Sequence, residues 1–429
     1  MTAVHAPLAG AIFVLALAAV ITRPRGVAEA WWAAAGALLM LAVGAVSPRG
    51  AATAVVGHWN LFLFLFGLMA ISGLADAAGF FDATGAVAAG IARGSGRRLL
   101  LATFAAGAVT TAVLSNDATA LILTPVVYTV VTRLLLPPLP YLFAATFVAN
   151  TASMTLPVSN PINVLVGEQL RLPLGSYLLH LLPAAVAAVA VAALLFLAVF
   201  WRDVDQRFEI DWRRMLAEAA PGGLQLRLTV AGLAATAAGY LIASTLGLPV
   251  GPVAVAGAVL LAALAASARQ LQLGPVREHV SLTLLLYVAG LFVMVQGLEE
   301  AGTTQALVSG LARLATSPTA AVGVGTVGAA FAANLVNNLP ATLFLLSGSG
   351  VVTGTAHAPF LVGLLAGADL GPNLTPVGSL STMLWLVVVR RRGVQVSTAE
   401  YLKLGALVTP ALLLVSWALI AASCRLWPL

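Results

Sequence analysis

ADLGPNLTPVGS (residues 368–379) breaks an apolar stretch with an acid, two prolines, two glycines and several polar side chains. NTASMTLPVSNP (residues 150–161) breaks an earlier stretch in the same way, and its Pro157-Val158 pair precedes the matching Pro376-Val377 pair by 219 residues. Prolines remove backbone donors and glycines permit dihedrals that other residues avoid, so neither segment suits a continuous helix. We therefore predict two broken helices with polar groups at their breaks.

The sequence around these segments requires a membrane as its solvent. Of the 429 residues, 61% are hydrophobic and 8% are charged, whereas soluble domains carry about 25% charged residues. Apolar runs of the ~20 residues needed to span a bilayer recur along the chain. The net charge of +6 is interpreted as basic residues on the cytoplasmic face of the membrane rather than as a nucleic-acid-binding surface. A single cysteine excludes a disulfide framework and a cysteine metal cage.

The apolar runs predict an all-α polytopic membrane protein with ten crossings and two re-entrant hairpins. Polar tips at Ser115-Asn116-Asp117 and Asn337-Asn338 divide residues 99–135 and 318–352 into short arms, so we expect each segment to return to the side from which it entered. The crossings are predicted near residues 8–22, 30–47, 60–77, 140–167, 175–201, 227–246, 249–268, 279–298, 357–389 and 402–424.

Basic residues predict the orientation. With the N-terminus outside, all but four of the 21 Lys and Arg residues fall on the inner side, the exceptions being Arg49, Arg171, Arg313 and Arg425. This bias appears only if each hairpin returns to the side of the membrane from which it entered. We therefore predict a bacterial inner-membrane protein with both termini outside.

The chain also contains an inverted repeat. Gly73-Leu74 recurs as Gly297-Leu298, and the tips and breaks recur at a similar spacing. Such a repeat with paired breaks is typical of secondary transporters, and backbone groups freed by a break must line a polar cavity or be buried in protein. The predicted units are N-terminal scaffold helices (1–57), a first repeat (58–201) with hairpin 99–135 and broken helix 140–167, a cytoplasmic linker (202–226), scaffold helices (227–277) and an inverted second repeat (278–429) with hairpin 318–352 and broken helix 357–389.

Asp117 and Asp369 are the acids that this arrangement places in mid-membrane, where an ionised carboxylate is costly. We predict that they couple transport to protons, with Asn116 and Asn338 orienting them. The alternative is a structural carboxylate that caps a half-helix. Glu168, near a crossing end, is interpreted as a solvated charge.

The other polar side chains of the tips and breaks are uncharged, which suits a neutral polyhydroxy solute held through its hydroxyls. The alternative is that they only satisfy broken backbone. No cofactor or resident metal is predicted. The predicted substrate-binding residues are Ser115, Asn116, Asp117, Thr119, Asn150, Thr151, Ser153, Asn160, Asn337, Asn338, Asp369, Asn373, Thr375 and Ser379.

Four segments resemble the ArsB-type arsenite and antimonite efflux carriers of the ion transporter superfamily: SNDATALILTP, ANTASMTLPVSNPIN, NLVNNLPAT and ADLGPNLTPVGSLSTMLW. The similarity extends over most of the chain. It implies export of arsenite or antimonite as neutral hydroxides in exchange for protons, with elevator-like movement of the hairpins and broken helices. It further implies a cytosolic ArsA-type ATPase partner in some members, and superfamily relatives suggest a homodimer.

Other functions stay open at this point. A sodium/proton antiporter or a sodium-coupled anion carrier could use the same scaffold, because Asp117 and the asparagines offer oxygen ligands for sodium. An anion would favour a cationic side chain, and the tips and breaks contain no Arg, Lys or His. A membrane enzyme is disfavoured because no GxSxG elbow, nucleotide loop or metalloprotease motif is present. A passive channel is disfavoured because it does not need an inverted repeat with paired helix breaks.

Overall fold

The computed structural model describes residues 5–209, 211–219 and 223–429. These residues fold into helices and turns, and their one β pairing is an isolated bridge between Ser95 and Arg207. The predicted all-α class is therefore confirmed. Residues 1–4 of the predicted N-terminal scaffold, and residues 210 and 220–222 of the predicted linker, lie outside the described residues.

The N-terminal helices lead into the first repeat. They are α1 (His5–Thr22), the 3-10 turn η1 (Pro24–Gly26), α2 (Glu29–Ala42), α3 (Pro48–Val56) and α4 (Trp59–Ala77). The next elements are α5 (Phe80–Ala92), α6 (Gly96–Val113), α7 (Asn116–Ala118), the π-helical turn η2 (Thr119–Leu123), α8 (Thr124–Arg133), α9 (Pro138–Thr151), the 3-10 turns η3 (Ser153–Thr155) and η4 (Pro157–Ser159), α10 (Pro161–Leu170) and α11 (Leu174–Val199).

The second half follows the same order after a connecting segment. That segment holds α12 (Trp212–Ala219), α13 (Leu224–Thr245), α14 (Val250–Ser267) and α15 (Leu273–His279). The second repeat holds α16 (Leu282–Glu300), α17 (Thr303–Ala312), α18 (Pro318–Val336), α19 (Asn338–Gly348), the 3-10 turns η5 (Ser349–Val351) and η6 (Gly354–Ala356), α20 (His357–Leu370), the 3-10 turn η7 (Gly371–Asn373), α21 (Leu380–Arg391) and α22 (Thr398–Leu426).

Seven helices in the described part of the chain are long and apolar enough to cross a membrane. Six of them coincide with predicted crossings, and the seventh, α18, is the first arm of the predicted second hairpin. The protein is therefore a multi-pass membrane protein, while the number of ten crossings stays a prediction. The seven are Trp59–Ala77, Leu174–Val199, Leu224–Thr245, Val250–Ser267, Gly274–Glu300, Pro318–Val336 and Thr398–Leu426.

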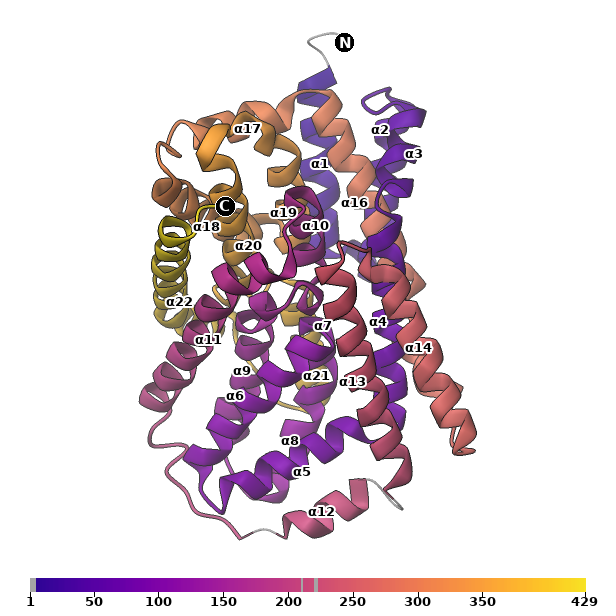
Figure 1. Ribbon diagram of the computed structural model, residues 1–429, viewed down its shortest axis with the longest axis vertical. Coiled ribbons are helices and arrows are strands. Elements are labelled where there is room, and N and C mark those ends of the chain that lie inside the picture. The colour runs from indigo at the N-terminus through magenta and orange to yellow at the C-terminus, as the bar shows by residue number, and fades with distance from the viewer. Residues whose placement is uncertain (1–4, 210, 220–222) are drawn as a thin grey trace.

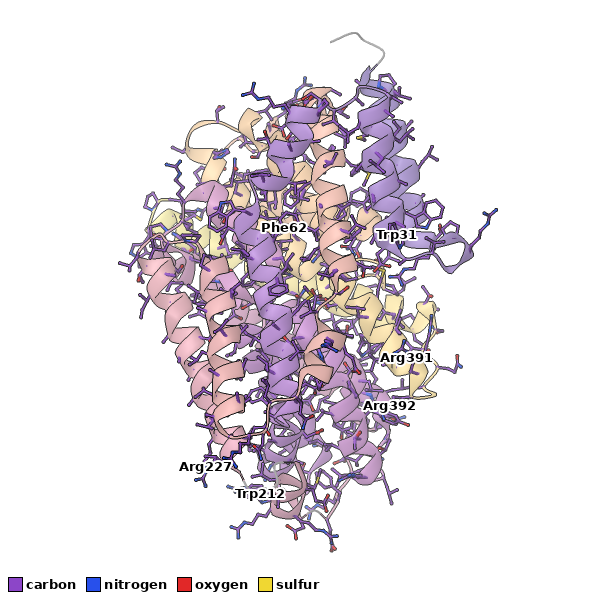
Figure 2. The ribbon with its side chains drawn as sticks, turned by 90° about the vertical axis from the view of Figure 1, so that its right-hand side faces the viewer. Trp31, Phe62, Trp212, Arg227, Arg391 and Arg392 are labelled. Atoms are coloured by element: carbon purple, nitrogen blue, oxygen red, sulfur yellow. The ribbon has the colours of Figure 1, made fainter. Side chains whose placement is uncertain are left out.

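The two helical hairpins approach the middle of the molecule from opposite ends. In Figure 1, α6 and α8 extend from the lower end toward α7, whereas α18 lies in the upper part. Helix α7 packs against α9 and α21, and α19 packs against α10 and α16. Trp212 and Arg227 lie at the lower end and Arg391 and Arg392 in the lower half, the end predicted to face the cytoplasm (Figure 2). Both hairpin turns therefore lie beside the broken helices.

Buried apolar side chains form two clusters. One is built mainly by α5–α11 and α17–α22, and includes Tyr141, Phe147 and Trp385. The other is built mainly by α1–α4 and α16, and reaches α10 and α19 through Val164, Leu165 and Leu343. The hairpins and broken helices thus share one core, to which the flanking helices α4, α13 and α14 also contribute a few residues.

Candidate functional site

Each hairpin turn begins its second arm with a side-chain cap. Ser115 Oγ accepts a hydrogen bond from the backbone nitrogen of Ala118 at 3.1 Å. Asn337 Oδ1 accepts one from the backbone nitrogen of Leu339 at 3.4 Å, and Asn337 has a φ of 78°. Asparagine tolerates such dihedrals better than most residues. Beyond these caps, Asn116 and Asp117 begin α7, and Asn338 begins α19.

The two broken helices resume in the same way after their breaks. Asn160 Oδ1 accepts from the backbone nitrogen of Ile162 at 3.3 Å at the start of α10. Ser379 Oγ accepts from the backbone nitrogen of Thr382 at 3.1 Å at the start of α21. Four half-helix N-termini are therefore capped by polar side chains, and helix N-termini carry partial positive charge.

All four N-termini line one cavity. It encloses about 440 Å³ of empty space including its mouth. Asp117 is its one ionisable acid, and no Arg, Lys or His lines it among the described residues. Helices α4 and α16 provide the facing wall. The lining residues are Leu65, Asn116, Asp117, Asn160, Pro161, Ile162, Leu284, Tyr287, Val288, Asn337, Asn338, Leu339 and Leu380.

Behind the cavity, Asn150 at the end of α9 joins the first broken helix to the second. Its side chain donates to Thr382 Oγ1 at 3.0 Å and to Asn373 Oδ1 at 3.2 Å. Its Oδ1 accepts from Ser379 Oγ and Ser381 Oγ, both at 3.1 Å. Asn116 Nδ2 donates to Ser381 Oγ at 3.3 Å, which links this buried network to the first hairpin turn.

Asp369, at the end of α20, occupies the position equivalent to Asn150 in the second half. Asn160 Nδ2 donates to its Oδ1 at 2.7 Å, and its Oδ2 is buried without a hydrogen-bond partner among the described residues. The expectation that Asn116 or Asn338 orients this carboxyl is wrong, because its partner comes from the break of the opposite repeat. Asn160 therefore connects the cavity to Asp369.

The remaining predicted site residues serve the local fold. Thr119 Oγ1 donates to the backbone oxygen of Ser115 at 2.9 Å and lies 2.8 Å from Thr111 Oγ1. Ser153 Oγ donates to the backbone oxygen of Asn150 at 2.7 Å. Asn373 Nδ2 donates to Thr151 Oγ1 at 3.0 Å, and Thr375 Oγ1 donates to Asn334 Oδ1 at 2.7 Å. The structure thus brings five predicted residues to the cavity and places the others beside or behind it.

Several site residues were missed by the sequence analysis. Ser381 and Thr382 follow the second break directly and continue its run of hydroxyls, so the local polarity is a signal that could have found them. Leu65 and Tyr287 lie within apolar helices, where one aliphatic or aromatic residue resembles any core position. No sequence pattern distinguishes those two.

Comparisons with known proteins agree with this architecture. Residues 16–367 match the family model CitMHS, described as a citrate transporter. The arsenical pump membrane protein of Escherichia coli K12 is 31% identical over 420 residues, covering 96% of this chain and 98% of that protein, and that of Yersinia enterocolitica has the same identity and coverage. The YdaH transporter of Alcanivorax borkumensis shares the fold, with a TM-score of 0.55, 16% identity and 88% of each chain covered. The citrate transporter family model and the arsenical pump relatives both identify a membrane transporter. The chain therefore belongs to the family of ArsB-type arsenical pump membrane proteins.

Proposed function

We propose that this transporter exports arsenite, and antimonite, from the cytoplasm as the neutral trihydroxide in exchange for protons. The observation that carries this proposal is the cavity in which both hairpin turns and both helix breaks meet. Its lining combines asparagine side chains and helix N-termini with one carboxyl, and none of the described residues that line it is cationic. Trihydroxy arsenic is uncharged near neutral pH, so it suits such a lining.

The solute is held through its hydroxyls. Asparagine and carboxylate oxygens accept from them, while amide and backbone N–H groups donate to their oxygens. Thiolate bonding is not available in the cavity, because the single cysteine, Cys424, is buried in α22 with its Sγ 3.9 Å from His180 Nδ1. Weak, reversible hydrogen bonds also suit release on the far side of the membrane.

Protons enter the cycle through two acids, the half-buried Asp117 and the buried Asp369. Asp117 lines the cavity itself, and Asp369 lies one hydrogen bond behind it through Asn160. A carboxylate accepts hydrogen bonds only, whereas a protonated carboxyl also donates one. Proton binding at Asp117 therefore changes what the cavity can hold, so that solute and proton compete. The hairpins and broken helices move as one unit against α1–α4, α13, α14 and α16, and they carry the solute outward and the proton inward in separate steps.

A carboxylate-anion carrier is the second candidate. The four helix N-termini would stabilise negative charge, and the matching family model is described as a citrate transporter. The carboxyl of Asp117 opposes such a substrate by charge repulsion. In this alternative, sodium rather than protons is the coupling ion.

The test is arsenite uptake into everted membrane vesicles under an imposed proton gradient, a sodium gradient or neither, with citrate as a competitor. Wild-type uptake should follow the proton gradient and ignore both sodium and citrate. Asp117→Asn should lower proton-driven uptake at least tenfold at equal protein level, because the amide cannot bind and release a proton.

The matched control is Asp203→Asn, which removes the same charge from an exposed position between α11 and α12 and should transport normally. Uptake driven by sodium, or inhibition of arsenite uptake by citrate, would favour the anion carrier. If arsenite does not move under any gradient, the proposed substrate is wrong.

A further inference from the structure

The polar side chains of the cavity fall into two groups. Three asparagines already have partners within the protein. Asn160 is bonded to Ile162 and Asp369. Asn116 accepts from the backbone nitrogen of Asp117 at 2.9 Å besides donating to Ser381, and Asn337 donates to the backbone oxygen of Val377 at 3.3 Å besides capping α19. These amides chiefly fix the shape of the turns and breaks.

Three other cavity side chains form no hydrogen bond with any described residue: Asp117, Asn338 and Tyr287. None of them is among the fully enclosed polar atoms that lack a partner. Because an unpaired polar group in an apolar surrounding is costly, such groups are expected to bind water or a solute. The groups available to a solute are therefore a carboxyl, an amide and a phenol.

We infer that Tyr287 is a substrate-binding residue, contributed to the cavity by α16; this inference rests on the proposed function. Tyr287 is the one polar side chain that α4 and α16 give to the cavity, since Leu65, Leu284 and Val288 make up the rest of their wall. A phenol hydroxyl both donates and accepts, so it can pair with an arsenic hydroxyl whichever way that hydroxyl points.

The three groups come from three separate elements. Asp117 lies on the first hairpin, Asn338 on the second, and Tyr287 on α16. A trihydroxide presents three hydroxyls in different directions, so one can meet each group. Movement of the hairpins past α16 would take the solute away from Tyr287, so this contact belongs to the conformation seen here and favours loading or release in that state.

The experiment compares Tyr287→Phe with wild type in proton-driven arsenite uptake, and also in arsenite binding to the purified protein by calorimetry. Removal of one neutral hydrogen bond should raise KM and Kd roughly threefold to tenfold. The maximal rate and its dependence on the proton gradient should remain unchanged, because the ring still fills the wall. A purely structural role would instead lower the amount of folded protein or the maximal rate.

Tyr240→Phe is the matched control, because the Tyr240 hydroxyl on α13 is buried and lines a different cavity. It should leave KM and Kd unchanged. If wild type binds and transports arsenite but Tyr287→Phe has the same KM and Kd, the assignment of Tyr287 is overturned while the proposed function stands. If wild type does not transport arsenite, the proposed function itself fails.

Discussion

Asp117 and Asp369 each correspond to an asparagine at the equivalent position of the other repeat. Asp117 corresponds to Asn338 at the hairpin turns, and Asp369 corresponds to Asn150 at the ends of α20 and α9. Carboxyl and amide have nearly the same shape, but only the carboxyl exchanges protons. The repeat thus places side chains of nearly the same shape at equivalent positions, while one position in each half is titratable.

This equivalence leads to a prediction for Asp369→Asn. The new amide oxygen can still accept from Asn160 Nδ2, as Asp369 Oδ1 does at 2.7 Å, so folding and membrane content should stay near wild type. The side chain can no longer bind a proton, so the dependence of arsenite uptake on pH should flatten. Uptake rates measured at a series of pH values check this.

The companion variant Asp369→Leu removes the acceptor altogether. It leaves the buried Asn160 donor unpaired, which costs about 1–3 kcal/mol, so the yield of folded protein should fall. A wild-type pH profile for Asp369→Asn would mean that this carboxyl is structural, which is the alternative that the sequence had left open.

The asparagines and acids of the site could be predicted from the sequence because amides and carboxyls stand out within apolar runs. Their partners could not, because Asn160 and Asp369 are 209 residues apart and meet only through the fold. Glu168 shows the same limit. Glu168 is exposed, as expected for a solvated charge, but the sequence could not show that it accepts a hydrogen bond from Asn60 Nδ2.

At the scale of elements, α18 and α20 pack through glycines. Gly363 and Gly367 of α20 lie against the backbone oxygens of Val322 and Thr326, and Gly325 of α18 lies against that of Phe360. Helices in membranes associate mainly through close packing, for which small residues allow backbones to approach. This contact fixes the helix that carries Asp369.

We predict that Gly367→Ala destabilises the protein by about 1–3 kcal/mol, because the added methyl overlaps a backbone oxygen that cannot move freely. Thermal unfolding of the detergent-solubilised protein measures the effect. Gly310→Ala is the control, since Gly310 is also helical but has open space around its Cβ position, and its Tm should be equal to or above that of wild type. A Tm for Gly367→Ala equal to that of wild type would contradict this tight packing.

The long helices and both breaks could be placed from the sequence because hydrophobic length and proline are strong local signals. The broken helices predicted at residues 140–167 and 357–389 are seen as α9 with α10 and α20 with α21. The short helices α3 and α15 and the π-helical turn η2 could not be placed, because stretches of five to nine residues depend on contacts made elsewhere in the fold.

At the scale of the whole molecule, the two apolar cores define two bodies. They touch along α10 and α19, and also along α4, α13 and α14, which contribute Ile71, Leu233 and Leu261 to the core of the hairpins. Within the described residues, one side-chain hydrogen bond joins the hairpins and broken helices to α1–α4, α13, α14 and α16. It links Glu168 of α10 to Asn60 of α4, and Asn60 Oδ1 also accepts from the backbone nitrogen of Gly251 at 2.6 Å. Such sparse polar contact would permit the two bodies to slide.

If the two bodies slide past each other during transport, a covalent link between α4 and α10 should stop transport. In a Cys424→Ser background, Asn60→Cys and Glu168→Cys joined by a short bis-methanethiosulfonate reagent should lower arsenite uptake at least tenfold, and a reductant should restore it. The control pair is Ser47→Cys with Glu300→Cys, because Ser47 and Glu300 are hydrogen-bonded at 3.1 and 3.2 Å within the flanking body. Their link should leave uptake unchanged, since α3 and α16 would move together. Full uptake by the protein linked between α4 and α10 would show that these helices keep their positions during transport, and elevator-like movement would have to be abandoned.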